Sequence, residues 1–183
     1  MFFGSGWLQP KGYNPAFTKV FAAVNKSDLR TSILHQLRQE LDRSSGAAAL
    51  ARDEAISEES RAENKWDTHS QEAAYLAEGQ ARHAAGIGES IELFTTLPLP
   101  EFPPEAAIAI GAVVELEDPR GRSSWYFIGP RAGGLEVESG GRNVLVVTPQ
   151  SPLGRQLLGK RTGDHVTTPG RGAAVRQRIA RVE

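Results

Sequence analysis

Four carboxylates lie close together in the middle of a long helical pattern, within a span of ten residues. Arg61 and Lys65 stand between them, so the cluster is acidic without being uniformly charged. Carboxylate oxygens are the preferred ligands of hard cations such as Mg²⁺, and they also pair with positively charged partner surfaces. A solvated polar turn that binds nothing has the same composition, and this alternative stays open. The four residues are Glu58, Glu59, Glu63 and Asp67.

Apolar residues at helical spacing flank the acidic cluster on both sides. Before it, apolar side chains recur every three or four residues over 29–41, behind a capping residue at Ser27 or Asp28. The spacing lapses at the cluster and then resumes. This pattern predicts an antiparallel helical hairpin with arms over about 28–55 and 68–94, whose tip is the acidic cluster. The seam of the second arm is expected at Ala73, Leu76, Gln80, His83, Ile87, Ile91 and Phe94.

The second half of the chain has the pattern of strands. Residues 95–105 contain four prolines, and proline ends a helix because it lacks the amide hydrogen, so a stiff linker is predicted there. Ser151 and Pro152 mark the start of a short helix, as a cap followed by proline. Strands with one short helix predict a small α+β domain over 106–183. The strands are expected at 108–116, 124–128, 135–138, 144–148, 165–168 and 175–182.

Composition and charge narrow the class of protein. The 183 residues include no cysteine, which excludes disulfides and thiolate metal sites. No apolar run is long enough to cross a bilayer, and the first residues lack the pattern of a secretory signal. We therefore expect a cytoplasmic protein that does not bind a membrane. The net charge is −1, but residues 27–94 carry thirteen acidic against seven basic residues. Residues 1–26, rich in aromatic residues, glycine and proline, are expected to be a poorly ordered extension.

Other residues are weaker candidates for chemistry. Trp66 stands within the tip near 58–67, where it either anchors a partner pocket or covers the end of the hairpin. The stretch 125–127 is aromatic and is expected in the core of a strand rather than in a ligand site. No histidine has a second histidine four residues away, so a zinc site is not expected. The four histidines are His35, His69, His83 and His165.

Residues 148–166 carry a sequence pattern that resembles a known family. A Ser-Pro-hydrophobic start, a short helix, a Gly-Lys pair, a Gly-Asp turn and a Pro-Gly hairpin follow one another in this order. The pattern resembles the C-terminal domain of bacterial Gre factors, the GreA/GreB transcript-cleavage proteins. Glu63 and Asn64 match the Glu-Asn pair that these factors carry at the tip of their coiled coil. The C-terminal matches are Ser151-Pro152-Leu153, Leu157-Leu158-Gly159-Lys160, Gly163-Asp164 and Pro169-Gly170.

The resemblance implies an antiparallel coiled coil followed by an FKBP-like α+β domain. It also implies a regulator of RNA polymerase that inserts the hairpin into the secondary channel and stimulates cleavage of backtracked transcripts. Such a factor is not an enzyme by itself, because the polymerase's own catalytic centre hydrolyses the RNA. It has no cofactor of its own, shares a Mg²⁺ ion with the polymerase, and meets nucleic acid only indirectly, within the elongation complex.

Particular residues take roles under this resemblance. Glu63 would be the primary ligand of the shared Mg²⁺, with Asn64 beside it and Glu58, Glu59 or Asp67 assisting. Further candidates for contact with the polymerase are Trp66 at the tip and Arg155, Lys160 and Arg161 around the short C-terminal helix.

One departure keeps alternatives open. The family carries an aspartate three residues before the tip glutamate, and this chain has Ser60 there. A secondary-channel binder that inhibits or tunes the polymerase without cleavage is therefore the closest alternative. A prolyl isomerase or chaperone-like module with a coiled-coil arm is the second. The oligomeric state and the role of residues 1–26 stay open.

Overall fold

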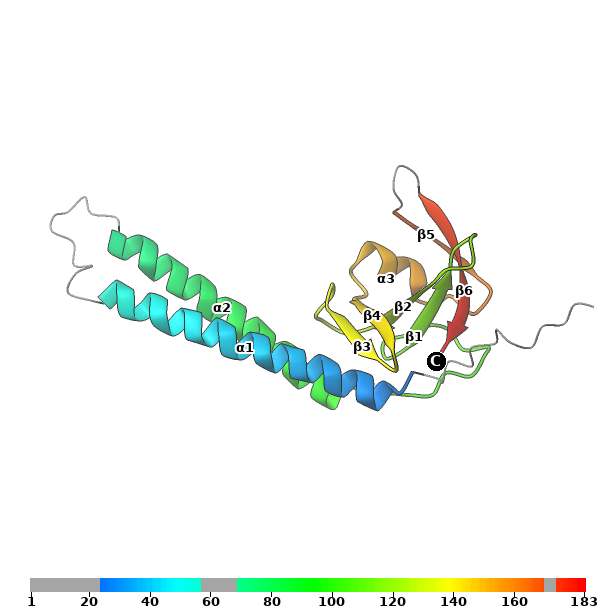
Figure 1. The fold of residues 1–183 in the computed structure, drawn as a ribbon, viewed down its shortest axis with the longest axis horizontal. Coiled ribbons are helices and arrows are strands. Elements are labelled where there is room, and N and C mark those ends of the chain that lie inside the picture. The colour runs from blue at the N-terminus through cyan, green and yellow to red at the C-terminus, as the bar shows by residue number, and fades with distance from the viewer. Residues whose placement is uncertain (1–23, 57–68, 170–173) are drawn as a thin grey trace, which may run out of the picture.

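A computed structural model of the chain describes residues 24–56, 69–169 and 174–183. Two long helices form a hairpin: α1, Lys26–Ile56, and α2, His69–Thr96, lie side by side and antiparallel (Figure 1). A domain containing a sheet and a short helix follows the hairpin, so the expected α+β fold with an N-terminal helical hairpin is confirmed. Most of the expected extension at 1–26 and the tip near 58–67 lie outside the described residues.

The first turn of α1 is capped two or three positions earlier than expected. The side-chain oxygen of Asn25 accepts hydrogen bonds from the amides of Ser27 and Asp28, at 2.9 and 3.2 Å. Asn25 is therefore the N-cap, where the sequence pattern had placed it at Ser27 or Asp28. α2 ends at Thr96 and so includes the first two residues of the predicted linker, 95–105; it stops there because proline at 98 cannot continue the ladder of amide hydrogen bonds.

Six strands form one sheet with the order β3-β4-β2-β1-β6-β5. The pair β2–β4 is parallel, and all other neighbours are antiparallel. Five strands lie within two residues of their predicted positions. The strands are β1 Val113–Glu117, β2 Ser123–Ile128, β3 Glu136–Ser139, β4 Arg142–Val147, β5 His165–Thr168 and β6 Val175–Val182.

The first strand was predicted to begin too early. β1 begins at Val113, and Ile108 instead pairs its backbone with the segment after α3, through the amide of Gly159 and the carbonyl of Lys160. Gly111, with φ of 91°, turns the chain between the two. This left-handed conformation favours glycine and breaks the extended run.

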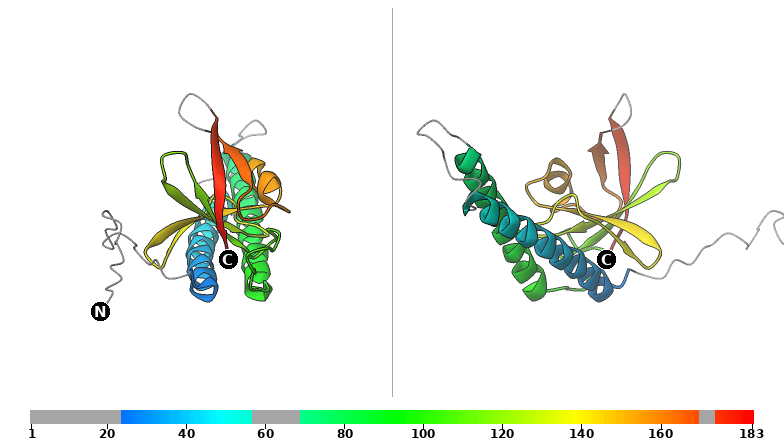
Figure 2. Two further views of the ribbon diagram at one scale, coloured as in Figure 1. Left: turned by 90° about the vertical axis from the view of Figure 1, so that its right-hand side faces the viewer. Right: turned by 60° about the vertical axis from the view of Figure 1, so that its left-hand side comes forward.

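Side chains alternate between the two faces of the sheet and build two cores. Val113, Phe127 and Val144 point to the face covered by the base of the hairpin, where they pack with the first turns of α1 and the last turns of α2. Leu116 and Ile128 point to the opposite face, which is covered by α3, Pro152–Leu157. Figure 2 shows the hairpin and α3 on opposite sides of the sheet. The hairpin base is thus part of the hydrophobic core of the domain.

The seam between the helices differs from its expected position. Leu76 is 56% exposed and His83 is also exposed, whereas Ala77 and Ala84 are half-buried. A series of buried or half-buried positions steps by three and four in strict alternation, which keeps a seam facing its partner. The positions that follow this spacing are Ala77, Gln80, Ala84, Ile87, Ile91 and Phe94, and Gly86, Gly88 and Ser90 beside them are also buried or half-buried.

The short helix α3 begins as the sequence predicts. Ser151 is its N-cap, and its hydroxyl accepts a hydrogen bond from the amide of Gly154 at 2.9 Å and donates one to the carbonyl of Thr148 at 2.8 Å. Gly154 is required here because a Cβ would lie 1.9 Å from that carbonyl oxygen.

We expect Ser151→Ala to lower the free energy of unfolding by about 1–2 kcal/mol, the usual contribution of an N-cap. The hydroxyl bonds to both Gly154 and Thr148, so its loss leaves two backbone groups without this partner. Urea unfolding measures the change. Ser45→Ala, at an exposed position inside α1, is the matched control and should leave stability unchanged or slightly raised. Equal effects of the two substitutions would contradict the assigned role of Ser151.

Candidate functional site

The hairpin points its far end away from the sheet. α1 ends and α2 begins at this remote end, beyond the buried core that joins the hairpin base to the domain (Figure 1). The predicted tip residues lie between the two helices in sequence and outside the described residues. They are Glu58, Glu59, Glu63, Asn64, Trp66 and Asp67, together with Ser60. The structure therefore describes the two helices on either side of the tip, and the roles of the tip residues stay predictions.

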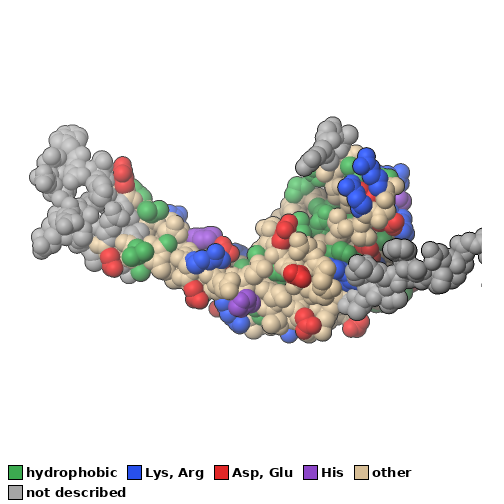
Figure 3. Space-filling model, in the orientation of Figure 1, with side chains coloured by type: hydrophobic (Ala, Val, Ile, Leu, Met, Phe, Trp, Pro, Cys, Tyr) green, Lys and Arg blue, Asp and Glu red, His purple; other side chains and the backbone are tan. Residues whose placement is uncertain are grey.

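The arms next to the tip expose large apolar side chains. Leu50 on α1 and Tyr75 and Leu76 on α2 are 73%, 72% and 56% exposed. Figure 3 shows green side chains on this distal part of the hairpin, over both helices. Small residues such as Ala77 occupy the seam there instead, because two helices pack closely where side chains are short.

The base of the hairpin is held against the domain by specific contacts. Glu89 on α2 and Arg131, in the loop after β2, form an ion pair at 2.8 Å. Gly129 lies where α2 meets the sheet, and a Cβ there would be 2.9 Å from Val146 and 3.0 Å from the ring of Phe94. The direction of the hairpin relative to the sheet is thus fixed by packing and reinforced by an ion pair.

The start of α1 is also tied to the linker. The ammonium of Lys26 donates a hydrogen bond to the carbonyl of Pro100 at 2.6 Å and lies 4.6 Å from the ring centroid of Phe102. Burial lowers the pKa of Lys26, an effect that the carboxylates of Glu101 and Glu183 partly oppose. These contacts join the first turn of α1 to the segment that leads into the domain.

The three basic candidates of the C-terminal domain gather around α3. Arg155 is exposed on the helix, and Lys160 and Arg161 follow it, half-buried and exposed respectively. The amide of Arg161 donates to the carboxylate of Asp164 at 2.9 Å, which fixes the turn into β5. The structure brings the three residues onto one short segment, and whether they contact a partner stays a prediction.

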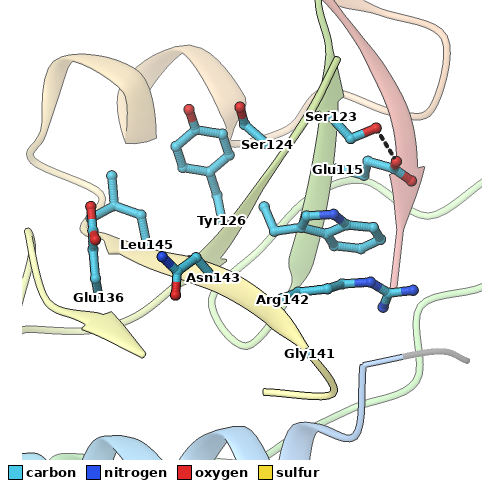
Figure 4. Close-up of a pocket in the computed structure, with 10 residues that line it drawn as sticks. Glu115, Ser123, Ser124, Tyr126, Glu136, Gly141, Arg142, Asn143 and Leu145 are labelled. Carbon is cyan, nitrogen blue, oxygen red and sulfur yellow. Dashed lines mark hydrogen bonds between the residues drawn. The ribbon is translucent and has the colours of Figure 1, made fainter. Parts of the chain in front are cut away.

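A groove of about 570 Å³ at the start of β2 and β4 was not expected from the sequence. In Figure 4, Tyr126, Leu145 and Glu136 line one side of it, and Glu115 and Arg142 line the other.

The groove includes a cation–π pair. The guanidinium carbon of Arg142 lies 4.2 Å from the ring centroid of Trp125. Trp125 was expected in the core and is half-buried, whereas Phe127 is buried as predicted. Arg142 and Trp125 meet because β2 and β4 are parallel neighbours, and no local sequence pattern shows that pairing.

A second cleft, of about 520 Å³, lies between the hairpin and the loop 131–135. His83 and Glu40 stand 3.4 Å apart across the two helices at its edge. Among the described residues, no group of three or more histidine, aspartate or glutamate side chains is placed to hold a metal ion. Within this described part, no helix combines the length and apolar character needed to cross a membrane.

Comparison with models of known families gives a match in the C-terminal part of the chain. Residues 103–183 match the family model described as "Transcription elongation factor, GreA/GreB, C-term". These residues comprise the sheet and α3, so the match lies in the C-terminal domain and does not include the hairpin. The match to the GreA/GreB family thus covers less than half of the chain. No curated protein sequence gives a significant match to the chain.

Several solved structures are also similar. The GreA factor homolog 1 (Gfh1) of Thermus thermophilus shares 22% identity over 82% of this chain and 94% of that one, with a TM-score of 0.35. Gfh1 of Thermus aquaticus shares 23% identity over 86% of this chain and 93% of that one, with a TM-score of 0.37. A transcription elongation factor GreA/GreB from Nitrosomonas europaea shares 20% identity over 53% of this chain and 78% of that one, with a TM-score of 0.35. We draw no functional conclusion from likenesses at these TM-scores.

Proposed function

We propose that the chain is a cytoplasmic regulator of transcription elongation that binds RNA polymerase and inserts its hairpin into the secondary channel. The observation that carries this proposal is the joining of two parts. A domain of the GreA/GreB family is fused through a shared hydrophobic core to a hairpin. In the sequence, the four carboxylates lie between the two helices of that hairpin.

A fixed hairpin suits this role because a tip that acts on a distant catalytic centre must be aimed. Phe94 of α2 is fully buried against Phe127 of the sheet, with ring centroids 6.3 Å apart. Together with the Glu89–Arg131 ion pair, this contact makes the direction of the arms a property of the folded domain. Placing a reacting group in advance lowers the entropic cost of reaching the productive geometry.

The tip residues suit a shared Mg²⁺ ion by their donor chemistry. Mg²⁺ prefers carboxylate oxygens, and Glu63 would hold it, with Glu58, Glu59 or Asp67 assisting. When bound, the ion would stabilise charge on the oxygens of the reacting phosphate. Asn64 would donate a hydrogen bond beside Glu63. Hydrolysis itself belongs to the polymerase, so the chain contributes ligands and orientation rather than a complete active site.

The C-terminal domain would make a second contact, at the rim of the channel. Arg155 and Arg161 are exposed near α3, and Lys160 lies between the helix and the turn. Two linked contacts bind more tightly than either alone, because the first raises the effective concentration of the second. Trp66 at the tip would fill an apolar pocket of the channel.

A second candidate function is inhibition without cleavage, and Ser60 favours it. A serine cannot supply the carboxylate that the family places at this position, which lowers the number of hard ligands. The hairpin would still occupy the channel and block it.

The decisive experiment places the wild-type protein on stalled, backtracked elongation complexes with labelled RNA. Shortening of the transcript above the intrinsic rate supports the cleavage function. Without shortening, competition against an established cleavage factor supports the inhibitory function. A protein that neither stimulates cleavage nor competes would overturn both. An Arg155→Glu/Arg161→Glu variant is expected to bind polymerase more weakly, with a Glu136→Gln/Glu138→Gln variant, exposed on β3, as the control.

A further inference from the structure

Among the described strands, β5 lies at one edge of the sheet and has β6 as its single neighbour. An edge strand presents backbone amides and carbonyls that can pair with another chain. At Thr167 both of these groups are bound by one side chain from α3. The amide nitrogen of Gln156 donates to the carbonyl of Thr167 at 2.9 Å, and the amide of Thr167 donates to the side-chain oxygen of Gln156 at 2.9 Å.

The Gln156 side chain thus imitates a neighbouring strand. A residue in an antiparallel ladder exchanges two hydrogen bonds with the residue opposite, one as donor and one as acceptor. The carboxamide offers the same donor and acceptor and forms both bonds with Thr167. It therefore occupies the place in which a backbone would lie if a strand were added to this edge.

The carboxamide is held in position by the packing of α3. Leu157, the next residue, is fully buried in the core that also contains Val166 of β5. Ser151 caps the helix, and Gly154 packs directly against the carbonyl of Thr148. With the helix fixed in this way, the two hydrogen bonds cost Gln156 little further ordering of the backbone.

The described part of the β5 edge has few other protections. Its residues, His165–Thr168, include no lysine, no proline and no bulge, so the protections of this kind are the four-residue length of the strand and Pro169 directly after it. Because ladder groups alternate in direction, the backbone groups of His165 also point outward, as those of Thr167 do. Two copies of β5 could then pair antiparallel about Val166, with His165 of each opposite Thr167 of the other. Such a pairing is self-complementary and closes as a two-fold dimer.

We propose that Gln156 is a built-in cap that prevents β5 from pairing with β5 of a second copy of this chain. The cap does not involve the tip carboxylates. Its removal exposes an edge whose natural partner is the same edge of another molecule.

The test compares the mass in solution of the full chain with Gln156→Ala, by light scattering over a series of concentrations. Wild-type protein is expected to keep one mass, and the variant is expected to rise towards twice that mass. Gln150→Ala, at an exposed position before α3, is the matched control and should behave as wild type. Gln156→Met keeps the length of the side chain without its amide, and should associate as well. Circular dichroism establishes that each variant is folded.

A second substitution locates the association. Thr167→Pro removes the outward amide hydrogen at the edge, and edge strands tolerate proline. The double variant Gln156→Ala/Thr167→Pro is expected to return to the mass of the wild type. Association that persists in the folded double variant would place the contact elsewhere and overturn the proposal. Folded Gln156→Ala and Gln156→Met proteins that both keep the wild-type mass would overturn it equally.

Discussion

Glu63→Gln is expected to abolish stimulated cleavage of backtracked transcripts while leaving the affinity for polymerase nearly unchanged. The substitution removes a charged ligand for a hard cation but keeps the shape of the side chain. A loss on the order of 10-fold to 100-fold or more is expected, since even residues that only orient metal ligands contribute that much. Labelled-transcript cleavage and a binding competition, measured on the same samples, separate the two quantities.

Neighbouring substitutions give this expectation its controls. Glu58→Gln and Glu59→Gln should be milder, because the assisting carboxylates can replace one another. Ser60→Asp should raise activity, because it restores the acid that the family carries at this position. A fall in polymerase affinity on Glu63→Gln would indicate instead that the carboxylate pairs with a basic residue of the channel. If the wild-type protein competes for the channel but does not stimulate cleavage, the inhibitory function is supported, and Ser60 is the first residue to which the lack of cleavage would be attributed.

Local patterns predicted most of the fold. The alternation of β6 and the Ser-Pro start of α3 each depend on residues close in sequence, and both were located correctly. The seam of α2 was not, because Leu76 and Ala77 both satisfy a spacing of three or four. The choice between them depends on where α1 lies, and close packing favours the smaller side chain at the interface.

Contacts between distant segments could not be predicted. Arg142 meets Trp125 only because β2 and β4 are parallel neighbours, and Gln156 meets Thr167 only because α3 lies beside β5. The chemistry of the tip is the reverse case. Its residue types suit a hard cation or a basic partner surface, and the resemblance to Gre factors implies Glu63 as a ligand of a shared Mg²⁺. The arrangement of Glu63 and its neighbours lies outside the described residues.

Phe94→Ala is expected to lower the free energy of unfolding by about 3–5 kcal/mol, the usual cost of removing a buried phenylalanine. Phe94 is fully buried, its ring centroid lies 6.3 Å from that of Phe127, and a Cβ at Gly129 would lie 3.0 Å from its ring. It lies in a core cluster that contains residues from α1, α2 and the sheet. Since whole domains are stable by roughly 5–15 kcal/mol, this single change would remove a large part of the total.

The adjacent residue provides the matched control. Leu93 is 41% exposed on the same turn of α2, and Leu93→Ala should change stability by no more than about 0.5 kcal/mol. Urea unfolding followed by circular dichroism measures both variants. Similar losses in the two would mean that Phe94 does not connect the hairpin to the sheet. If Phe94→Ala also weakens the stimulation of transcript cleavage in samples that remain folded, the aim of the hairpin depends on this contact, because the substitution is remote in sequence from the tip carboxylates.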